Sequence, residues 1–424
     1  MSMGLDVYLV GGAVRDELLG VSAQDRDWVV VGAAPEELVA LGYRPVGKEF
    51  PVFLHPRTGE QYALARTERK VAPGYRGFNV HAAPGVTLHD DLRRRDLTIN
   101  AMARDPAGRL IDPFGGRRDL AAGRLRHVSD AFGEDPVRIL RVARFAARFA
   151  NRGFTVAPDT LGLMQRMVVD GEVDALVADR VWMEFDRALG ESTPSRFIEV
   201  LRECGALARL FAEINALFGV PQPARYHPEI DTGAHTLLSV DAAARLSAER
   251  AVRYAALVHD LGKALTPPSQ WPRHIGHEQA GLAPIRALGR RVRAPKAYTT
   301  LAELVCRHHL SMHRLPEMTP AKVLALLEAL DAIRRPARLA RFALACEADM
   351  RGRHGRESAP YPPAELLFGY ARAAGALDLS DLSADSGRGP QIAQRVRERR
   401  LAAIVLARNR YRRNASSATP STSR

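Results

Sequence analysis

The sequence predicts an α+β protein in which a mixed head of strands and helices precedes a mainly helical remainder. β-branched runs at Val7 to Val10, Trp28 to Val31 and Val52 to Leu54 alternate with Gly and Pro up to about His127. After Gly133 these strand signals fade, and stretches rich in Ala and Leu recur with helical periodicity. The 424 residues, 46% of them apolar, can form more than one core, since a domain takes roughly 100 to 200 residues.

Helices are expected at several places along the chain. An early one covers Ala13 to Leu19, between the first two strands. Clusters of Pro and Gly at Phe218 to Pro228 and at Gly352 to Pro363 mark boundaries between helical units. The last ten residues, Ala415 to Arg424, lack the apolar surface to order themselves. The later helical stretches are Pro136 to Phe149, Thr160 to Met167, Val181 to Leu189, Ser195 to Phe211 and Ala251 to Leu261.

The composition predicts a polyanionic partner. Lys and Arg outnumber Asp and Glu by 61 to 48, which favours RNA or DNA over a small neutral substrate. The three cysteines are far apart and form no CxxC pair, as is typical of a reducing cytoplasm. No apolar run approaches the roughly 18 residues needed to cross a bilayer, so we expect a protein that is neither secreted nor bound to a membrane.

A glycine turn followed by an aspartate pair is the first motif with chemical content. Gly11 and Gly12 join a strand to a helix, a turn that lets a triphosphate approach the backbone closely. Asp25 and Asp27 open the next strand and project from one face of it, where they can hold a pair of Mg²⁺ ions. A solvated polar turn is the plain alternative for either motif alone, and their succession favours the metal site.

Two arginine-rich clusters follow. Arg93, Arg94 and Arg95 precede a mixture of polar and apolar residues that is typical of a helix start. The forked guanidinium group of arginine suits contacts with phosphate and ribose. In the second cluster Asp135 is expected to cap a helix, with Arg138 one turn later beside it. An acceptor next to a donor matches the Watson–Crick edges of cytosine and adenine, whereas uracil and guanine would leave groups unpaired at a cost of roughly 1 to 3 kcal/mol each.

These motifs together resemble the ordered series of class II tRNA nucleotidyltransferases, and most closely the bacterial multifunctional CCA branch of that family. The resemblance covers Tyr8 to about Arg353. It implies template-independent addition and repair of the tRNA 3′ CCA from CTP and ATP, with Mg²⁺ on the catalytic Asp25 and Asp27. It implies that Asp135 and Arg138 read the base. The residues that it implies for holding the nucleotide are Gly12, Arg15, Arg95, Arg141 and Arg144.

Relatives often carry a third carboxylate on a later strand. The matching stretch from Gln61 to Arg66 has none, and Glu60 and Glu68 are the nearest candidates. The assignment stays open at the level of sequence.

A second metal site is predicted in the helical part. His259 and Asp260 adjoin at the end of an apolar helix, a good half-site for a divalent cation if further ligands arrive from elsewhere. The pattern resembles the HD phosphohydrolase superfamily, which implies phosphatase, 2′-nucleotidase and 2′,3′-cyclic phosphodiesterase activities and a transition metal such as Ni²⁺. His235 is expected as a further ligand, and His309 or Asp349 completes the set. Other candidates are His277 and His308.

The expected organisation is a catalytic head over 1–132, a helical neck for nucleotide base and tRNA over 133–222, an HD-type domain over 223–333, a helical tRNA-binding region over 334–414 and a disordered tail over 415–424. A monomer and a homodimer both fit the sequence. The alternatives are a poly(A) polymerase, an HD phosphohydrolase with an inert nucleotide-binding head, and an RNA-binding protein without catalysis.

Overall fold

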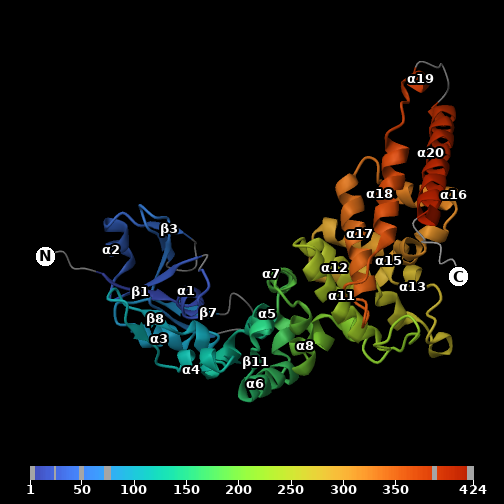
Figure 1. Ribbon diagram of the computed structural model, residues 1–424. Helices are drawn as coiled ribbons and strands as arrows, with labels where there is room; N and C mark the ends of the chain where they lie inside the picture. Colours follow the sequence, from blue (N-terminus) through green and yellow to red (C-terminus); the bar gives the residue numbers. More distant parts are fainter. Residues whose placement is uncertain (1–4, 23–24, 47–51, 71–77, 384–388, 418–424) are drawn as a thin grey trace. The chain divides into compact units, whose positions relative to one another are not determined.

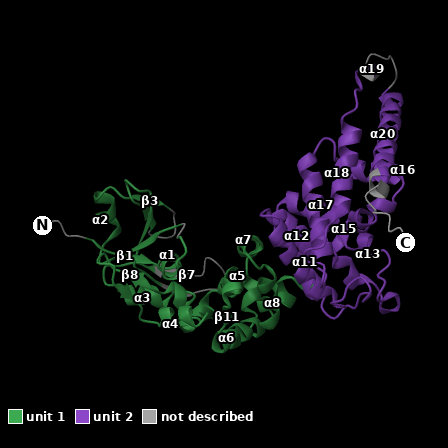
Figure 2. Ribbon diagram, in the orientation of Figure 1, with its two compact units in different colours: residues 1–212 green, residues 213–424 purple. Residues whose placement is uncertain are grey.

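The computed structural model describes residues 5–22, 25–46, 52–70, 78–383 and 389–417. The chain forms two compact units, Met1–Ala212 and Glu213–Arg424, shown in green and purple in Figure 2. The first unit contains the strands and the second is helical (Figure 1). The predicted α+β class is confirmed.

The first unit is built on a sheet of seven strands in the order β3-β4-β5-β2-β1-β8-β9. β1 pairs antiparallel with β2 and with β8, while β2 pairs parallel with β5. The other neighbours are antiparallel. The bounds are β1 (Asp6–Val10), β2 (Asp27–Val31), β3 (Arg44–Val46), β4 (Val52–Leu54), β5 (Gln61–Leu64), β8 (Ala103–Arg104) and β9 (Leu110–Ile111). Two small sheets pair β6 (Thr67–Lys70) with β7 (Phe78–His81) and β10 (Arg124–Leu125) with β11 (Thr155–Val156).

The register of this sheet places the glycine turn beside the aspartates. Val10, the last residue of β1, pairs with Asp27, the first residue of β2, so the turn at Gly11 starts next to that carboxylate. Asp27 in turn pairs with Gln61 of β5. The end of β1 and the beginnings of β2 and β5 therefore share one edge of the sheet.

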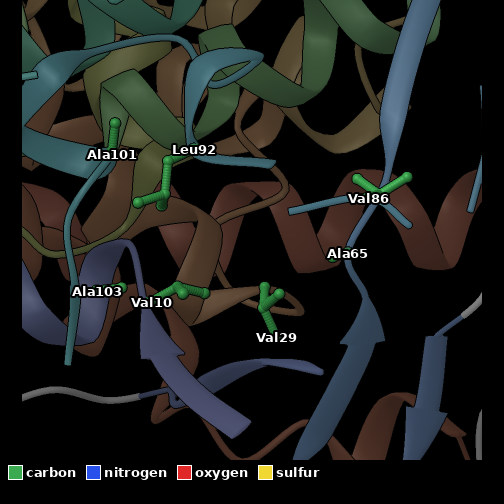
Figure 3. Packing of buried hydrophobic residues seen from close by; sticks show 7 residues of the cluster. All are labelled: Val10, Val29, Ala65, Val86, Leu92, Ala101 and Ala103. Atoms are coloured by element: carbon green, nitrogen blue, oxygen red, sulfur yellow. The ribbon is translucent and has the colours of Figure 1, made fainter. Parts of the chain in front are cut away.

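Apolar side chains hold both faces of the central strands. Val29 belongs to a cluster that Figure 3 shows with Val10 and Leu92, while its neighbour Val30 belongs to a second cluster with Phe53 and Leu64. This alternation is what a strand buried on both sides requires. Each fully buried aliphatic side chain contributes about 1.5 to 3 kcal/mol, so the sheet edge that carries the polar residues has a rigid base.

Helices complete the first unit. α5 turns the row Arg138, Arg141, Arg144 and Arg148 to one side, because these residues follow one another at helical spacing. The opposite side of α5 is apolar and fully buried. The bounds are α1 (Gly12–Leu18), α2 (Pro35–Ala40), α3 (Leu88–Arg93), α4 (Gly116–Ala121), α5 (Val137–Phe149), α6 (Pro158–Val169), α7 (Ala178–Leu189), α8 (Ser195–Glu203) and α9 (Ala206–Leu210), with α10 (Ala212–Asn215) at the border of the units.

The second unit is a helical bundle. α12 packs against both α11 and α15, and α17 packs against all three. The bounds are α11 (Thr232–Leu246), α12 (Arg250–Val258), α13 (His277–Ala280), α14 (Leu282–Arg291), α15 (Lys296–His313), α16 (Pro320–Ala329), α17 (Pro336–Arg351), α18 (Pro362–Gly375), α19 (Ser380–Ser383) and α20 (Gly389–Ser417). Of the expected tail, 418–424 lies outside the described residues, whereas α20 reaches Ser417.

Three local expectations differ from the structure. Arg93 ends α3 instead of preceding a helix start, and only a 3₁₀ turn, Thr98–Asn100, follows. The stretch from Ser195 to Phe211 divides into α8 and α9, because Gly205 adopts a left-handed conformation with φ of 85°. α12 stops at Val258, one residue before the predicted metal ligands. Among the described residues, no helix has the length and apolarity that spanning a membrane requires.

Candidate phosphate-binding and metal sites

A cavity of about 690 Å³ in the first unit gathers every residue that the sequence predicts for nucleotide and metal binding there. It opens at the sheet edge where β1 ends and β2 begins. The predicted residues that line it are Gly12, Arg15, Asp25, Asp27, Arg95, Asp135, Arg138, Arg141 and Arg144. Segments more than a hundred residues apart in sequence thus meet at one site.

The glycine turn is sterically required. Gly11 has a φ of 71°, and a Cβ atom placed there would lie 2.9 Å from a guanidinium nitrogen of Arg95. The Gly11 amide donates to the carbonyl of Met102 at 3.1 Å, which fixes the turn against the strand segment that follows the arginine cluster. A side chain at this position would both strain the backbone and displace Arg95.

The two aspartates line the cavity together. Asp27 is solvent-exposed within it, yet the surrounding walls remove part of the hydration of its carboxylate, which raises its pKa. The nearby charge of Asp25 acts in the same direction, whereas Arg95 opposes it. A carboxylate that protein walls and a second negative charge destabilise gains strongly from a divalent cation, and hard cations prefer such oxygen ligands.

The stretch of β5 in which the sequence lacks a carboxylate contributes neutral residues to the cavity. Gln61 and Ala63 line the cavity on β5, in register with Asp27 and Val29. Glu60 instead accepts a hydrogen bond from the indole of Trp28 at 3.2 Å and does not line the cavity. Glu68 lies on β6, and its side chain is outside the described part of the structure.

Buried acids orient the arginines of the cavity. Arg141 donates to Asp96 at 2.7 Å, and Arg144 donates to Glu184 at the same distance. The charge of Asp96 raises the pKa of Arg141. Burial alone would raise the pKa of Asp96, but Arg141 and a hydrogen bond from Asn100 hold it below the ordinary value. These pairs hold both arginines at the cavity lining.

Two further arginines are held in the same manner. Arg15 lies 2.8 Å from Asp16 and also donates to Asn100, and it is almost fully buried. Arg95 lies 3.0 Å from Asp91, a carboxylate with no exposed surface. The sequence motifs contain both acids, Asp16 beside Arg15 and Asp91 four residues before Arg95, but their pairing with these arginines was not predicted.

Asp135 and Arg138 have different hydrogen-bond partners in the structure. The guanidinium of Arg138 donates to the backbone carbonyls of Ala131 and Arg94, at 2.6 and 2.7 Å. Asp135 instead receives two parallel hydrogen bonds from Arg180, at 3.0 and 2.7 Å. Asp135 and Arg138 both line the cavity. The orientation of their side chains is determined by partners in α7 and in the chain before α5.

The carboxylate of Asp135 also acts at the start of α5, as the sequence predicted. It accepts a hydrogen bond from the amide of Val137 at 3.1 Å. Asp135, Arg138 and Arg180 all line the cavity. Sequence analysis missed Arg180, which lies 45 residues after its partner.

The second unit contains a buried cluster of imidazoles and carboxylates from five segments. His235 comes from α11, and His259 and Asp260 directly follow α12. All members of the cluster are nearly or fully buried. The remaining members are His277 of α13, His309 of α15 and Asp349 of α17.

The polar atoms of this cluster lie close enough together to hold a metal ion. His235 Nε2 lies 3.0 Å from Asp349 Oδ1, and His259 Nε2 lies 3.2 Å from Asp260 Oδ2. His259 Nε2 and Asp260 Oδ1 are buried and have no hydrogen-bond partner within the described structure. Both predicted ways of completing the ligand set, His309 and Asp349, are in place. His308 belongs to none of the groups found among the described residues.

Charged neighbours stabilise the carboxylates of the cluster. Burial by itself would raise the pKa of Asp260, but His259 and Lys263 hold it well below its usual range. Burial lowers the pKa of His309 to about 3, so its imidazole is neutral. His235 Nδ1 lies 2.9 Å from Glu229, a residue that sequence analysis did not identify. Burial alone would lower the pKa of His259, but Asp260 and Asp349 raise it, so a metal ion binding there would displace a proton.

A basic cavity of about 950 Å³ adjoins this cluster. It shares His277 with the cluster, and Lys263, which pairs with Asp260, also lines it. Its other basic side chains are Arg273, Arg314, Lys322 and Arg353. Such a lining suits a phosphorylated ligand placed next to a metal centre.

Three family models match the chain. The Poly A polymerase head domain matches residues 7–126, the probable RNA and SrmB-binding site of polymerase A matches 153–218, and the HD domain matches 232–335. The first match contains Asp25 and Asp27, and the third contains His235, His259, Asp260 and His309.

Curated relatives match almost the full length. A multifunctional CCA protein of Nitrosococcus oceani is 60% identical over 403 residues, 95% of this chain and 98% of that protein. One from Methylococcus capsulatus is 59% identical over 417 residues, 98% of this chain and 97% of that protein.

Solved structures share the fold. The Bacillus stearothermophilus CCA-adding enzyme in complex with CTP is 24% identical with a TM-score of 0.64, over 98% of this chain and 95% of that chain. The Thermotoga maritima CCA-adding enzyme complexed with tRNA is 22% identical with a TM-score of 0.60, over 94% of this chain and 87% of that chain.

Proposed function

The chain belongs to the family of multifunctional CCA proteins, and we propose that it adds and repairs the 3′-terminal CCA of tRNA, using CTP and ATP. The observation that carries this proposal is the cavity in which Asp25 and Asp27 face a row of oriented arginines. Two carboxylates opposite several guanidinium groups suit a nucleoside triphosphate and its metal ions.

Asp25 and Asp27 are the residues that would hold Mg²⁺, which supplies charge to activate the tRNA 3′ hydroxyl and to neutralise the departing pyrophosphate. Arg15 and Arg95 lie near the aspartates and bind the triphosphate oxygens. Arg141 and Arg144, fixed by Asp96 and Glu184, orient the nucleotide from α5. Because their acidic partners hold them in position, little side-chain entropy is lost when the nucleotide binds.

Selection of cytosine and adenine is assigned to the end of the cavity at Asp135. Its carboxylate can accept from the exocyclic amine that both bases carry. A guanidinium can donate to the adjacent ring nitrogen, and Arg138 and Arg180 are the two candidates. Uracil and guanine would set carbonyl oxygens against the carboxylate.

Incubation with tRNA that lacks its last three nucleotides tests this function. With CTP, ATP and Mg²⁺, sequencing of the 3′ ends should show CCA. A poly(A) polymerase would instead add adenosine runs and ignore CTP. No extension at all would support the reading as a phosphohydrolase with an inert head, or as an RNA-binding protein without catalysis.

The second unit is proposed to be a metal-dependent phosphohydrolase. The support is the cluster of His235, His259, Asp260, His309 and Asp349, in which His259 Nε2 and Asp260 Oδ1 are buried without a hydrogen-bond partner among the described residues. Its imidazoles favour a transition metal such as Ni²⁺ over Mg²⁺. The proposed substrates are phosphomonoesters, 2′-nucleotides and 2′,3′-cyclic phosphates, and hydrolysis of each with Ni²⁺ and with Mg²⁺ is the test.

Binding of tRNA is assigned to the neck over 133–222 and to the region over 334–414. The support in the latter is α20, whose sequence has eight arginines and one glutamate. Loss of affinity with rising salt would measure this electrostatic contribution. The proposal also assigns a catalytic head to 1–132 and an HD-type domain to 223–333, and it places the protein in the cytoplasm. Sedimentation would distinguish a monomer from a homodimer.

A further inference from the structure

The cationic side chains of the basic cavity differ in what they are paired with. Lys263 lies 2.7 Å from Asp260, and Arg353 lies 3.3 Å from Asp349. Because both aspartates are buried members of the cluster, these two cations belong to the end of the cavity next to the cluster. A phosphate bound at this end meets the proposed hydrolytic centre.

Arg273 and Lys322 line the same cavity without an acidic partner. Both residues are exposed, and neither side chain has an ion pair or a hydrogen bond among the described residues. Arg314 differs from them, since it lies 3.3 Å from Glu317. The cavity therefore contains two cations whose charge no protein acid of the described chain neutralises, and an anion from solution can pair with both.

The stability of α16 does not explain the position of Lys322. This residue lies in the first turn of α16, where the helix dipole favours negative charge and where the sequence has no acid. Thr319 caps the same end and also lines the cavity. The beginning of α16 thus attracts an anion through its dipole and through an unpaired ammonium group together.

An exposed aromatic ring belongs to the same lining. Tyr226 is 56% exposed, although the guanidinium of Arg225 lies over its ring at 5.6 Å from the centroid. The amide of Tyr226 donates to the carbonyl of Pro223 at 3.0 Å, which fixes the turn before α11. Bases of single-stranded RNA stack on such rings whatever their sequence, and arginine adds to the stack.

The size of the cavity admits more than one phosphorylated group. Ligand cavities measure roughly 300 to 1,000 Å³, and this one measures about 950 Å³. It therefore has room for a nucleoside between two phosphates. The observations supply a binding partner for each part: the cluster end for one phosphate, Tyr226 for the base, and the unpaired cations for the other phosphate.

We propose that the basic cavity binds the 3′ end of an RNA strand. The terminal phosphate lies at the buried cluster, the last base stacks on Tyr226, and the phosphodiester that joins the last nucleotide to the strand pairs with Arg273 and Lys322. This inference rests on the proposed phosphohydrolase function of the same unit. A free nucleotide that is phosphorylated on its 5′ oxygen offers the same second anion and is the alternative source.

The reaction at such an end is the opening of a 2′,3′-cyclic phosphate. Water adds to the phosphorus, and one of the two bonds between phosphorus and a ribose oxygen breaks. One water proton passes to the departing ribose oxygen, and the other passes to the new phosphomonoester. The side chains named for the base and the inward phosphate take no part in this step, so they are binding residues that set substrate preference.

Three substrates test the assignment with the full chain and Ni²⁺. They are adenosine 2′,3′-cyclic phosphate, the same nucleotide with a 5′ phosphate, and an adenosine dinucleotide that ends in the cyclic phosphate. We expect kcat/KM for the dinucleotide to exceed that for the first substrate at least about tenfold, because charged contacts are added. A gain for the 5′-phosphorylated nucleotide alone would overturn the RNA end in favour of a free nucleotide.

Variants of the binding residues should change this preference. Arg273→Ala and Lys322→Ala should each lower the ratio of dinucleotide to mononucleotide kcat/KM toward one, mainly through KM for the dinucleotide. Tyr226→Ala should raise KM for every substrate, and Tyr226→Phe, which keeps the ring, should restore it.

Lys296→Ala is the matched control for Lys322→Ala. Lys296 is also an exposed lysine in the first turn of a helix, α15, and has no ion pair among the described residues, but it does not line the cavity. Its variant removes the same charge from the same unit and should keep the full ratio. An equal fall in the ratio for both lysine variants would contradict the assignment.

The failure of this inference can be distinguished from the failure of the phosphohydrolase. A ratio near one in the parent chain, with the mononucleotide still hydrolysed, overturns the RNA end and leaves the phosphohydrolase standing. If no substrate is hydrolysed, the phosphohydrolase fails, and isothermal titration of the dinucleotide still tests the cavity. Equal affinity of the parent and of Arg273→Ala, with both folded by circular dichroism, would then overturn the binding site as well.

Discussion

The two aspartates of the nucleotide cavity are the carboxylates available to hold metal there, because the other acids that line it, Asp16, Asp96 and Asp135, are each paired with an arginine. Asp25→Ala or Asp27→Ala should therefore lower CCA addition by about three orders of magnitude, equivalent to about 4 kcal/mol of transition-state stabilisation. Binding of tRNA should change little, since the basic surface supplies it. Single-turnover addition and filter binding measure the two quantities.

Glu60→Ala is the matched control for this pair. Glu60 is close in sequence to the expected third carboxylate, but it binds Trp28 and lies outside the cavity lining. Addition should persist in this variant. Near-normal addition by both aspartate variants would contradict the metal assignment.

Base selection is the second prediction at this scale. Asp135→Asn replaces an oxygen acceptor by an amide that can also donate, so the penalty on UTP and GTP should fall by roughly 1 to 3 kcal/mol, about 5- to 150-fold in relative kcat/KM. Competition between CTP and UTP on tRNA ending before the first C measures this ratio. The adjacent Glu134→Gln should leave the ratio unchanged, and an unaltered ratio in an active Asp135→Asn protein would place selection elsewhere.

The sequence was informative for residues whose type and spacing carry the chemistry. Asp25, Asp27 and the arginines are recognisable because charged groups recur at short intervals around a glycine turn. Glu184 and Arg180 were not recognisable, because their partners come from other elements through tertiary packing. In the second unit, two ligand assignments remained open for the same reason, and the structure brings both His309 and Asp349 into the cluster.

At the scale of elements, the ion pair between Asp96 and Arg141 ties α5 to the segment after α3. The pKa of Asp96 is lowered in the folded state, so its contribution is complete above the unfolded value near 4 and declines as the pH falls below it. Asp96→Asn should lower stability by about 2 kcal/mol at pH 7.

Urea denaturation of both proteins between pH 3 and pH 7 measures this linkage. The difference in stability between parent and Asp96→Asn should narrow as the pH falls below about 4, because the unfolded parent then protonates this carboxyl while the folded parent keeps it ionised. A difference that stays constant over the whole range would show that the lowered pKa of Asp96 does not contribute to stability.

Close packing between two elements requires glycine at position 262. A Cβ atom on Gly262 would lie 2.0 Å from the carbonyl of His277, so only glycine lets the turn after Asp260 approach α13. Gly262→Ala should separate these elements and weaken metal binding by the buried cluster at least about tenfold, as small displacements do in metal sites. Isothermal titration with Ni²⁺ measures the change.

Gly369→Ala provides the comparison for Gly262→Ala. Gly369 lies in α18, and a Cβ atom there meets no atom within 4 Å. This variant should keep full metal affinity and gain about 0.5 to 1 kcal/mol of stability from better helix propensity. Equal metal affinity in both variants would contradict the argument from packing.

Element prediction succeeded where the pattern was long and local. The strands at β1, β2 and β4 and the helix α5 agree with their predicted bounds to within a residue or two. The break at Gly205 was missed although its left-handed turn is local, and the break after Val258 was missed because it depends on the packing of Gly262 against α13. Helical periodicity continues across such breaks and does not reveal them.

At the scale of the whole molecule, the two candidate sites lie in different compact units, the nucleotide cavity within 1–212 and the buried cluster within 213–424. Metal chemistry acts through ligands in direct contact, so each site should operate without the ions of the other. His259→Ala or Asp260→Ala should therefore abolish Ni²⁺-dependent hydrolysis of 2′,3′-cyclic phosphates and phosphomonoesters while CCA addition survives. Asp27→Ala should have the reverse effect.

Both activities are to be measured on the same preparations of the parent, His259→Ala and Asp27→Ala proteins, with Mg²⁺ and with Ni²⁺ in separate reactions. His308→Ala serves as the control, because it removes an imidazole that belongs to none of the candidate metal-binding groups among the described residues. Reciprocal loss would show that the two chemistries are independent. His259→Ala could remain folded by circular dichroism and nevertheless lose CCA addition. The two units would then have to be energetically coupled, because His259 does not line the cavity proposed to bind the nucleotide.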